Sequence, residues 1–192
     1  PEYSDVGLAY DVLAALRWLS GIAAGLGLDP ARIALMGDSG GGGIAAATAI
    51  MARNEGLSVA KQILVYPMLD DTTVDPDPLI APFARWTYDF NRTAWHAVLS
   101  NPVTQATAAP LVPPTRLSDL SGLPPTYIEV GELDIFRDEC VSYAQKLMHA
   151  GVSCELHILA GCPHLFEGAD WASTVSTEAL GRRAAAIKGI YK

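Results

Sequence analysis

The run of residues 33–47 constrains the fold more than any other part of this sequence. It reads IALMGDSGGGGIAAA: a short apolar run, a glycine-rich corner that carries one serine, and an alanine-rich run. An apolar strand that enters a G-x-S-x-G turn and leaves as a helix is the pattern of a nucleophile elbow, where a strained turn lifts the serine hydroxyl clear of the sheet. Side chains at Gly37 and Gly41 would collide with backbone passing close to such a turn. The pattern therefore predicts a strand, a tight corner and a helix, with Ser39 as the candidate nucleophile.

Two further apolar runs and one segment that alternates apolar and polar residues, 154–159, place this corner in a parallel sheet. The helix after Ser39 is expected to end near residues 54–56, and a second buried strand follows at residues 63–66, where Pro67 stops it. A helix between two short apolar strands is a βαβ unit, which implies a parallel sheet with a right-handed crossover. Ligands of such sheets bind beyond the carboxyl ends of the strands, where Ser39 lies. Further strands are predicted at residues 126–131 and 154–159, and further helices at about 9–21, 136–147 and 172–190.

Between about residues 71 and 120 this pattern is interrupted by many prolines and by an aromatic-rich run that includes Phe83, Trp86, Tyr88, Phe90 and Trp95. The segment is too long for an ordinary connection, and it is interpreted as an excursion with one or two helices that covers the site as a lid. The alternative is that the aromatic side chains only pack the excursion onto the body. We expect residues 1–192 to form a single domain with this excursion.

The net charge and the cysteine content limit which partners and which cellular compartment we expect. The formal net charge of −8 argues against nucleic acid or an anionic membrane as partner, because phosphates would be repelled. Three cysteines, Cys140, Cys154 and Cys162, form no disulfide framework, and no secretory signal or membrane-spanning run is visible, so a cytoplasmic setting is expected. The chain begins at Pro1 without a methionine and enters a helix almost at once, as a fragment or a processed product would.

A nucleophilic serine needs a base, and the sequence has four histidines. His96 falls in the excursion, His149 on a helix next to its final glycine, and His157 on an alternating strand, so each has a structural interpretation. His164 lies just past the end of the final strand, at the edge where the serine corner also emerges. His164 is therefore the candidate base.

The base in turn needs an acid that orients it. Asp134 directly follows the strand at residues 126–131, within GELDIFRD. Glu132 and Asp138 compete for this role, although Asp138 is typical of a charge in the first turn of a helix. Asp134 is the candidate acid.

The chain order Ser39, Asp134, His164 is the order of α/β-hydrolases. GDSGG, GELDIFRDE and CPHLFEG resemble the three catalytic blocks of the hormone-sensitive-lipase-like esterases, the bacterial family IV group of that fold, and YPMLD at residues 66–70 resembles that family's block after the next strand. The resemblance covers nearly all of the chain and weakens at about residues 71–120. It implies an α/β-hydrolase fold, with a mainly parallel sheet and helices on both faces.

The resemblance also implies a function. We expect hydrolysis of small-molecule carboxylic esters with short to medium acyl groups through an acyl-enzyme on Ser39. In that scheme His164 acts as general base and then acid, Asp134 orients His164, and the backbone N–H of Gly40 donates to the oxyanion. No metal or organic cofactor is implied.

Two departures from the family pattern involve single residues, Gly40 where alanine is usual and Leu165 where glycine is usual. A larger departure is that the HGGG block, which supplies oxyanion-hole donors, and the first strands of the sheet are absent from this chain. Because losing one such donor costs about 10²- to 10³-fold in turnover, we expect impaired activity. An open edge on the elbow strand would invite a second copy or a complementing N-terminal segment.

Other functional classes fit less well. GDSGG also occurs at the serine of chymotrypsin-like proteases, but there the serine comes last of the three residues and the fold is a β-barrel. A zinc site would need paired C-x-x-C spacing, which the cysteines lack. The stronger alternative is a catalytically inactive fragment or a member of the fold that only binds its ligand.

Overall fold

The computed structural model describes residues 6–99 and 113–191. Its centre is a four-stranded sheet in the order β1-β2-β3-β4, and each neighbouring pair of strands is parallel. The strands are β1 (Ala34–Asp38), β2 (Lys61–Val65), β3 (Thr126–Gly131) and β4 (Cys154–Leu159). They agree with the four predicted runs to within two residues at each end, and the predicted parallel sheet is confirmed.

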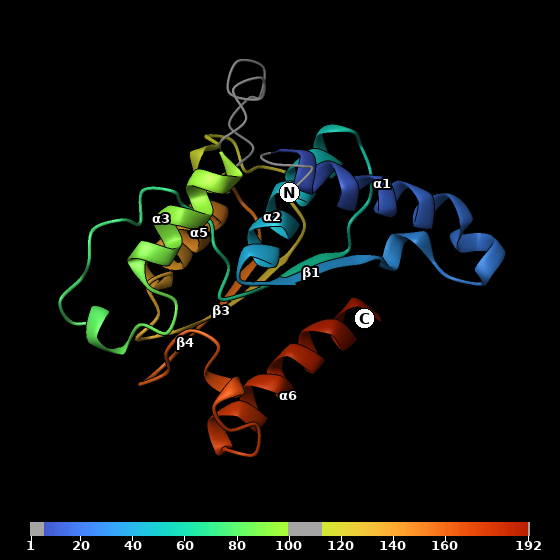
Figure 1. The fold of residues 1–192 in the computed structure, drawn as a ribbon. Coiled ribbons are helices and arrows are strands. Elements are labelled where there is room, and N and C mark those ends of the chain that lie inside the picture. The colour runs from blue at the N-terminus through green and yellow to red at the C-terminus, as the bar shows by residue number, and fades with distance from the viewer. Residues whose placement is uncertain (1–5, 100–112, 192) are drawn as a thin grey trace.

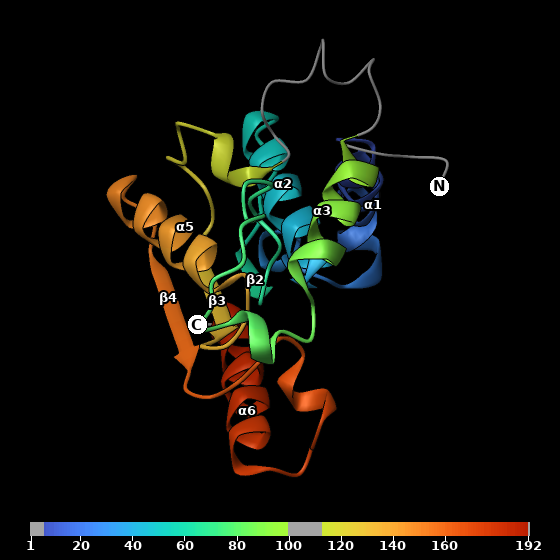
Figure 2. The same ribbon diagram turned by 60° about the vertical axis from the view of Figure 1, so that its left-hand side comes forward.

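Helices cover both faces of the sheet, as predicted (Figures 1 and 2). On one side lie α1 (Val6–Ile22), α2 (Gly40–Asn54), α3 (Tyr88–Val98) and α5 (Arg137–His149), and on the other lies α6 (Thr174–Lys188). Short 3-10 helices occupy Ala23–Leu26, Pro30–Arg32, Ala81–Phe83, Pro114–Arg116, Phe166–Gly168 and Gly189–Tyr191. No helix within residues 6–99 and 113–191 is long and apolar enough to cross a membrane.

The core follows from the position of each element. β3 has neighbours on both sides and is buried at all six of its residues, and the side chains of Leu64 and Ile128 are fully buried. α2 can lie close to the sheet because its buried face consists largely of alanines, among them Ala45, Ala46 and Ala49. Because these side chains are small, α2 packs closely, and its N-terminus, which Ser39 caps, lies against the end of β1.

β1 and β4 are the outer strands of the sheet. Within the described residues β1 pairs only with β2, and the Met36 side chain on it is 51% exposed. This is the edge at which a complementing strand or a second copy is predicted, and that part stays a prediction.

The excursion predicted at about residues 71–120 contains α3, and part of it, residues 100–112, lies outside the described residues. Its aromatic side chains divide into two groups. Tyr88 and Trp95 are buried in the main core, whereas Phe83 and Phe90 are mostly exposed. Packing onto the body therefore accounts for some of these aromatic residues and not for others.

Gly37 is the glycine whose replacement we expect to disturb the elbow most. A Cβ at Gly37 would lie 2.2 Å from the backbone oxygen of Gly41, inside the first turn of α2. Because backbone cannot move aside as a flexible side chain can, Gly37→Ala is expected to lower the free energy of unfolding by about 3 kcal/mol or more. Urea denaturation measures this difference.

Gly21→Ala is the matched control, since a Cβ at Gly21 meets nothing within 4 Å. It lies in α1, where replacing glycine by alanine is expected to raise the free energy of unfolding by about 0.5–1 kcal/mol. Equal stabilities for the Gly37→Ala and Gly21→Ala proteins would contradict the close approach at the elbow.

Candidate active site

Ser39 occupies the corner between β1 and α2. Its backbone has φ 53° and ψ −123°, a conformation that residues other than glycine rarely adopt. The corner is fixed by its backbone hydrogen bonds: the N–H of Ser39 donates to the oxygen of Val65 (2.9 Å), and the oxygen of Ser39 accepts from the N–H of Gly42 (3.0 Å) and Met68 (2.9 Å). Neighbouring elements therefore hold the strained residue in place, as the elbow pattern predicts.

The three predicted residues form one hydrogen-bonded chain. Ser39 Oγ lies 3.0 Å from Nε2 of His164, and Nδ1 of His164 lies 2.7 Å from Oδ2 of Asp134. His164 and Asp134 are buried, the first on the loop after β4 and the second in the turn between β3 and α5. Asp134 and His164 lie 95 and 125 positions after Ser39 in the sequence. They meet it because the parallel strands all end at one edge of the sheet.

The partners of Asp134 determine the tautomer of His164. The other carboxylate oxygen, Oδ1, accepts the backbone N–H of Phe136 at 3.0 Å. Because an ionised carboxylate only accepts hydrogen bonds, Nδ1 of His164 carries the proton and donates it to Asp134. Nε2 is then left with a lone pair that can accept the hydroxyl proton of Ser39.

The competing candidates have other partners. The Glu132 carboxylate accepts the backbone N–H of Gly161 at 2.7 Å, and Asp138 pairs with its neighbour Arg137. Of the other histidines, His157 pairs with Glu155, and His96 and His149 are exposed. The structure brings none of these side chains into the hydrogen-bonded chain of Ser39.

Leu165 takes an unusual backbone conformation next to His164. Its φ of 54° lies in the left-handed region, which suits glycine, the residue usual in the resembled family at this position. The guanidinium of Arg85 donates to the Leu165 oxygen at 2.8 Å and so braces this turn from the excursion. Leu165 therefore adopts a backbone conformation that glycine would adopt at lower cost.

Aromatic rings surround the His164 imidazole. Tyr66 and Phe136 present their rings edge-on, with centroids 4.8 and 5.2 Å from that of His164, and Trp86 lies at 6.5 Å. Tyr66 also has a positive φ, 36°, at the end of β2. These rings limit the rotation of the imidazole.

The Gly40 N–H, the predicted oxyanion donor, belongs to the first residue of α2. The first N–H groups of a helix have no partner within the helix and carry its positive end. Gly40 also lines the pocket that opens at Ser39. Both properties suit a donor to a developing oxyanion.

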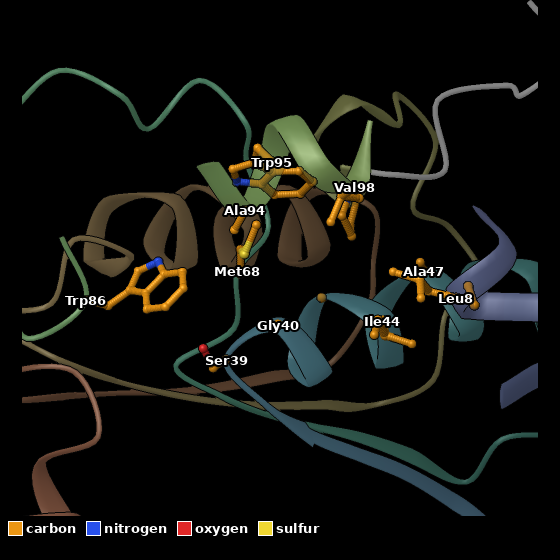
Figure 3. Close-up of a pocket in the computed structure, with 13 residues that line it drawn as sticks. Leu8, Ser39, Gly40, Ile44, Ala47, Met68, Trp86, Ala94, Trp95 and Val98 are labelled. Carbon is orange, nitrogen blue, oxygen red and sulfur yellow. The ribbon is translucent and has the colours of Figure 1, made fainter. Parts of the chain in front are cut away.

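An apolar pocket of about 260 Å³ opens at Ser39 and Gly40 (Figure 3). Its walls come from α1, α2, the loop after β2 and the excursion, through side chains that include Leu8, Ile44, Met68, Trp86, Trp95 and Val98. Figure 3 shows Trp86 and Met68 near the serine end and Leu8 at the far end. The pocket can therefore hold an apolar group whose reacting atom lies beside Ser39.

Sequence reasoning did not identify the pocket walls or the bracing residue Arg85. The aromatic-rich run around Trp86 and Trp95 was the available signal, since aromatic and apolar side chains concentrate at ligand pockets. That signal could not separate a pocket wall from a core residue, because both consist of the same residue types.

Glu139, on α5, has a buried carboxyl group that accepts hydrogen bonds from the segment that follows β2. Its Oε1 accepts the backbone N–H of Leu69 at 2.6 Å and of Asp70 at 3.3 Å, and its Oε2 contacts the hydroxyl of Thr73. Burial raises the pKa of Glu139 from 4.5 to about 8, although the hydrogen bonds from Leu69 and Thr73 lower it.

Glu139→Gln is expected to change how stability depends on pH. Because the pKa of Glu139 is raised in the folded state, its protonated form stabilises the fold fully below about pH 4.5, and this contribution falls as the pH rises towards about 8. Glutamine stays neutral, so the melting temperature of the variant minus that of the parent is expected to be more positive at about pH 8 than at about pH 5. Thermal unfolding at both pH values measures it.

Glu178→Gln, at an exposed position, is the matched control and should show no such trend. A difference between Glu139→Gln and the parent that is independent of pH would contradict the raised pKa of Glu139.

Among the described residues, no group of three or more His, Cys, Asp or Glu side chains is arranged to hold a metal ion. Cys140 and Cys162 are buried free thiols, and burial raises the pKa of both.

Several known proteins are similar to this chain in sequence and in structure. Carboxylesterase NlhH of Mycobacterium tuberculosis is 38% identical to this chain over 203 residues, which cover 98% of this chain and 60% of that protein. A bacterial heroin esterase is 35% identical with a TM-score of 0.89, and its structure matches 100% of this chain, which covers 62% of it. A thermostable carboxylesterase from a metagenomic library is 34% identical with a TM-score of 0.88 over 100% of this chain and 66% of its own.

The chain spans about 60% of the length of these curated relatives. The family model described as alpha/beta hydrolase fold matches residues 1–168, which include Ser39, Asp134 and His164. The chain therefore belongs to the alpha/beta hydrolase fold family, in its hormone-sensitive-lipase-like group.

Proposed function

We propose that this chain hydrolyses carboxylic esters through an acyl-enzyme, with Ser39 as nucleophile, His164 as general base and acid, and Asp134 as the residue that orients His164. The observation that carries this proposal is the buried chain of hydrogen bonds from Ser39 Oγ through His164 to Asp134. Esterase relatives and esterase structures support the same reaction class.

The chemistry has two halves. Ser39 Oγ attacks the ester carbonyl while Nε2 of His164 takes its proton, and the charge that develops on the carbonyl oxygen is stabilised by the N–H of Gly40. His164 then gives that proton to the departing alkoxide, which leaves as an alcohol. Water attacks the acyl-enzyme in the same manner, so the carboxylic acid leaves and Ser39 is restored.

The pocket supports a substrate with a short to medium apolar acyl or alkyl group. Its walls are mainly apolar side chains such as Ile44, Met68 and Val98, which offer no partner to a charged group, so a charged substituent would lose its hydration without compensation. Trp86 and Trp95 belong to the excursion and line this pocket, which supports a role of the excursion as a lid.

Reaction with a fluorophosphonate tests the proposal, because only an activated serine reacts with it. We expect one covalent adduct, located by mass spectrometry on the peptide that contains Ser39, and none in the heat-unfolded chain. Hydrolysis of p-nitrophenyl acetate, butyrate, octanoate and palmitate then gives the acyl preference, which we expect to favour butyrate over palmitate.

Absence of the adduct from the folded chain would contradict an activated serine and favour the alternative, a member of the fold that only binds its ligand. Binding of a non-hydrolysable ester analogue, measured by calorimetry in the same sample, would then identify that alternative directly.

A further inference from the structure

A buried cluster of charged and phenolic side chains lies behind His164, outside the pocket and outside the hydrogen-bonded chain of Ser39. It consists of Arg183, Glu129, Glu167 and Tyr66, and we call it the Arg183 cluster. All four side chains are buried. They come from α6, β3, the 3-10 helix after His164 and the end of β2.

Arg183 joins three separate parts of the fold. Its Nη1 donates to Oε1 of Glu167 at 2.5 Å, and its Nε and Nη2 donate to Oε1 of Glu129 at 2.9 and 2.7 Å. α6, which carries Arg183, lies on the face of the sheet opposite α2 (Figures 1 and 2). The guanidinium therefore ties the loop of His164 to the underside of β3.

Two routes connect this cluster to the imidazole. The first is covalent, because Glu167 is only three residues after His164 and lies in the short helix that ends the loop. The second is through Tyr66, whose hydroxyl donates to Oε1 of Glu167 at 2.9 Å and whose ring meets the His164 ring edge-on at 4.8 Å. Tyr66 also has a left-handed backbone conformation, which surrounding contacts have to maintain.

The cluster holds two carboxylates around the one guanidinium of Arg183, and Nε of Arg182 lies 3.8 Å from the second oxygen, Oε2, of Glu129. Burial by itself would raise the pKa of Glu167, but hydrogen bonds from Arg183 and Tyr66 outweigh it and lower that pKa below its usual range. Glu167 therefore stays ionised, and its Oε1 accepts hydrogen bonds from both the Arg183 guanidinium and the Tyr66 hydroxyl. A buried ion pair is rarely needed for stability, because apolar side chains of similar size often serve as well. Its location against the His164 loop indicates a different use.

We propose that Arg183 is a positioning residue: through Glu167 and Tyr66 it holds the His164 imidazole at the orientation in which Nδ1 faces Asp134 and Nε2 faces Ser39. The effect of Arg183 on catalysis rests on the proposed ester hydrolysis. Its effect on the orientation of the His164 imidazole does not depend on that function.

The first measurement is the low-field proton NMR resonance of the Nδ1–H of His164, assigned by its loss in His164→Gln. It reports the buried hydrogen bond to Asp134 whether or not the chain is active. We expect a sharp resonance in the parent chain, loss or exchange broadening of it in Arg183→Met and Glu167→Gln, and partial recovery in Arg183→Lys, which keeps the charge but not the fork of donors.

The second measurement is the rate of fluorophosphonate labelling at Ser39. A displacement of about 1 Å in a catalytic group can slow a reaction by about 10²-fold, so we expect Arg183→Met to label roughly 10- to 100-fold more slowly, and Arg183→Lys to fall between it and the parent. The KM for p-nitrophenyl butyrate should change little, because Arg183 does not line the pocket. Arg92→Met, which breaks an exposed ion pair with Asp89, is the control and should change neither readout.

The outcomes separate the two proposals. An unlabelled parent chain that still shows the resonance, with its loss in Arg183→Met, would overturn ester hydrolysis and support the positioning role. A labelled parent with an unchanged resonance and labelling rate in Arg183→Met and Glu167→Gln, even at lower melting temperature, would overturn the positioning role alone. If Arg183→Met does not fold, Tyr66→Phe carries the test, since it removes only the hydroxyl that Glu167 accepts and should broaden the same resonance; an unchanged one overturns the proposal.

Discussion

Replacing Ser39 by alanine is expected to lower the turnover of p-nitrophenyl butyrate by about 10⁶-fold, the size of effect seen when a serine hydrolase loses its nucleophile. The reason is that every covalent step of the proposed reaction passes through Ser39 Oγ, and among the described residues no other hydroxyl is hydrogen-bonded to Nε2 of His164. Initial rates at saturating ester, together with fluorophosphonate labelling, measure the loss.

Ser118→Ala is the matched control, because Ser118 is exposed and lies away from the pocket at Ser39. It should keep the parent rate. The Ser39→Ala protein should also keep its melting temperature to within a few degrees, since only one hydroxyl is removed. A Ser39→Ala protein that retained even one hundredth of the parent turnover would contradict an acyl-enzyme on this residue.

The four strands could be predicted from sequence because three are short, mainly apolar runs, and the fourth, at residues 154–159, alternates apolar and polar side chains as an outer strand does. β3 and β4 begin and end at the predicted residues, 126–131 and 154–159. β1 extends two residues beyond its apolar run, through Gly37 and Asp38 into the elbow, because those residues still pair with β2. That boundary depends on pairing with a neighbouring strand, and a local sequence pattern carries no information about such pairing.

The meeting of Ser39, Asp134 and His164 could be predicted for a topological reason. In a parallel sheet every strand ends at the same edge, so a residue placed just after each strand is brought near the others without any knowledge of distances. The roles of these residues stay proposals, but the placement needed only the positions of the strand ends.

The Arg183 cluster could not be predicted, because its members look ordinary in sequence. Arg183 stands beside Arg182 in a helix with many small residues, where a charge usually faces solvent. Glu129 lies inside β3, where a buried carboxylate contradicts the apolar pattern, and this conflict was the one available signal. The partner of a buried charge comes from a distant element, here 54 residues away, so only the structure identifies it.

Asp134→Asn is expected to slow both the hydrolysis of p-nitrophenyl butyrate and the labelling of Ser39 by about 10⁴-fold while leaving the fold intact. Asparagine has the shape of aspartate, and its oxygen can still accept the N–H of Phe136. The position facing His164 would then be an amide N–H, which donates, so Nδ1 would have to accept and the proton would move to Nε2.

With its proton on Nε2, His164 can donate to Ser39 Oγ but cannot take the proton from it, so the defect lies in the tautomer. Asp138→Asn, four residues further along the chain and exposed, removes the same charge without facing His164 and should keep nearly the parent rate. A loss of less than tenfold in Asp134→Asn would contradict the orienting role of Asp134. An equal loss in both variants would mean that the net charge near the site matters and the orientation of His164 does not. The 2.7 Å contact between Nδ1 and a fully buried carboxylate favours orientation, because the imidazole has no other acceptor for that proton among the hydrogen bonds of the described residues.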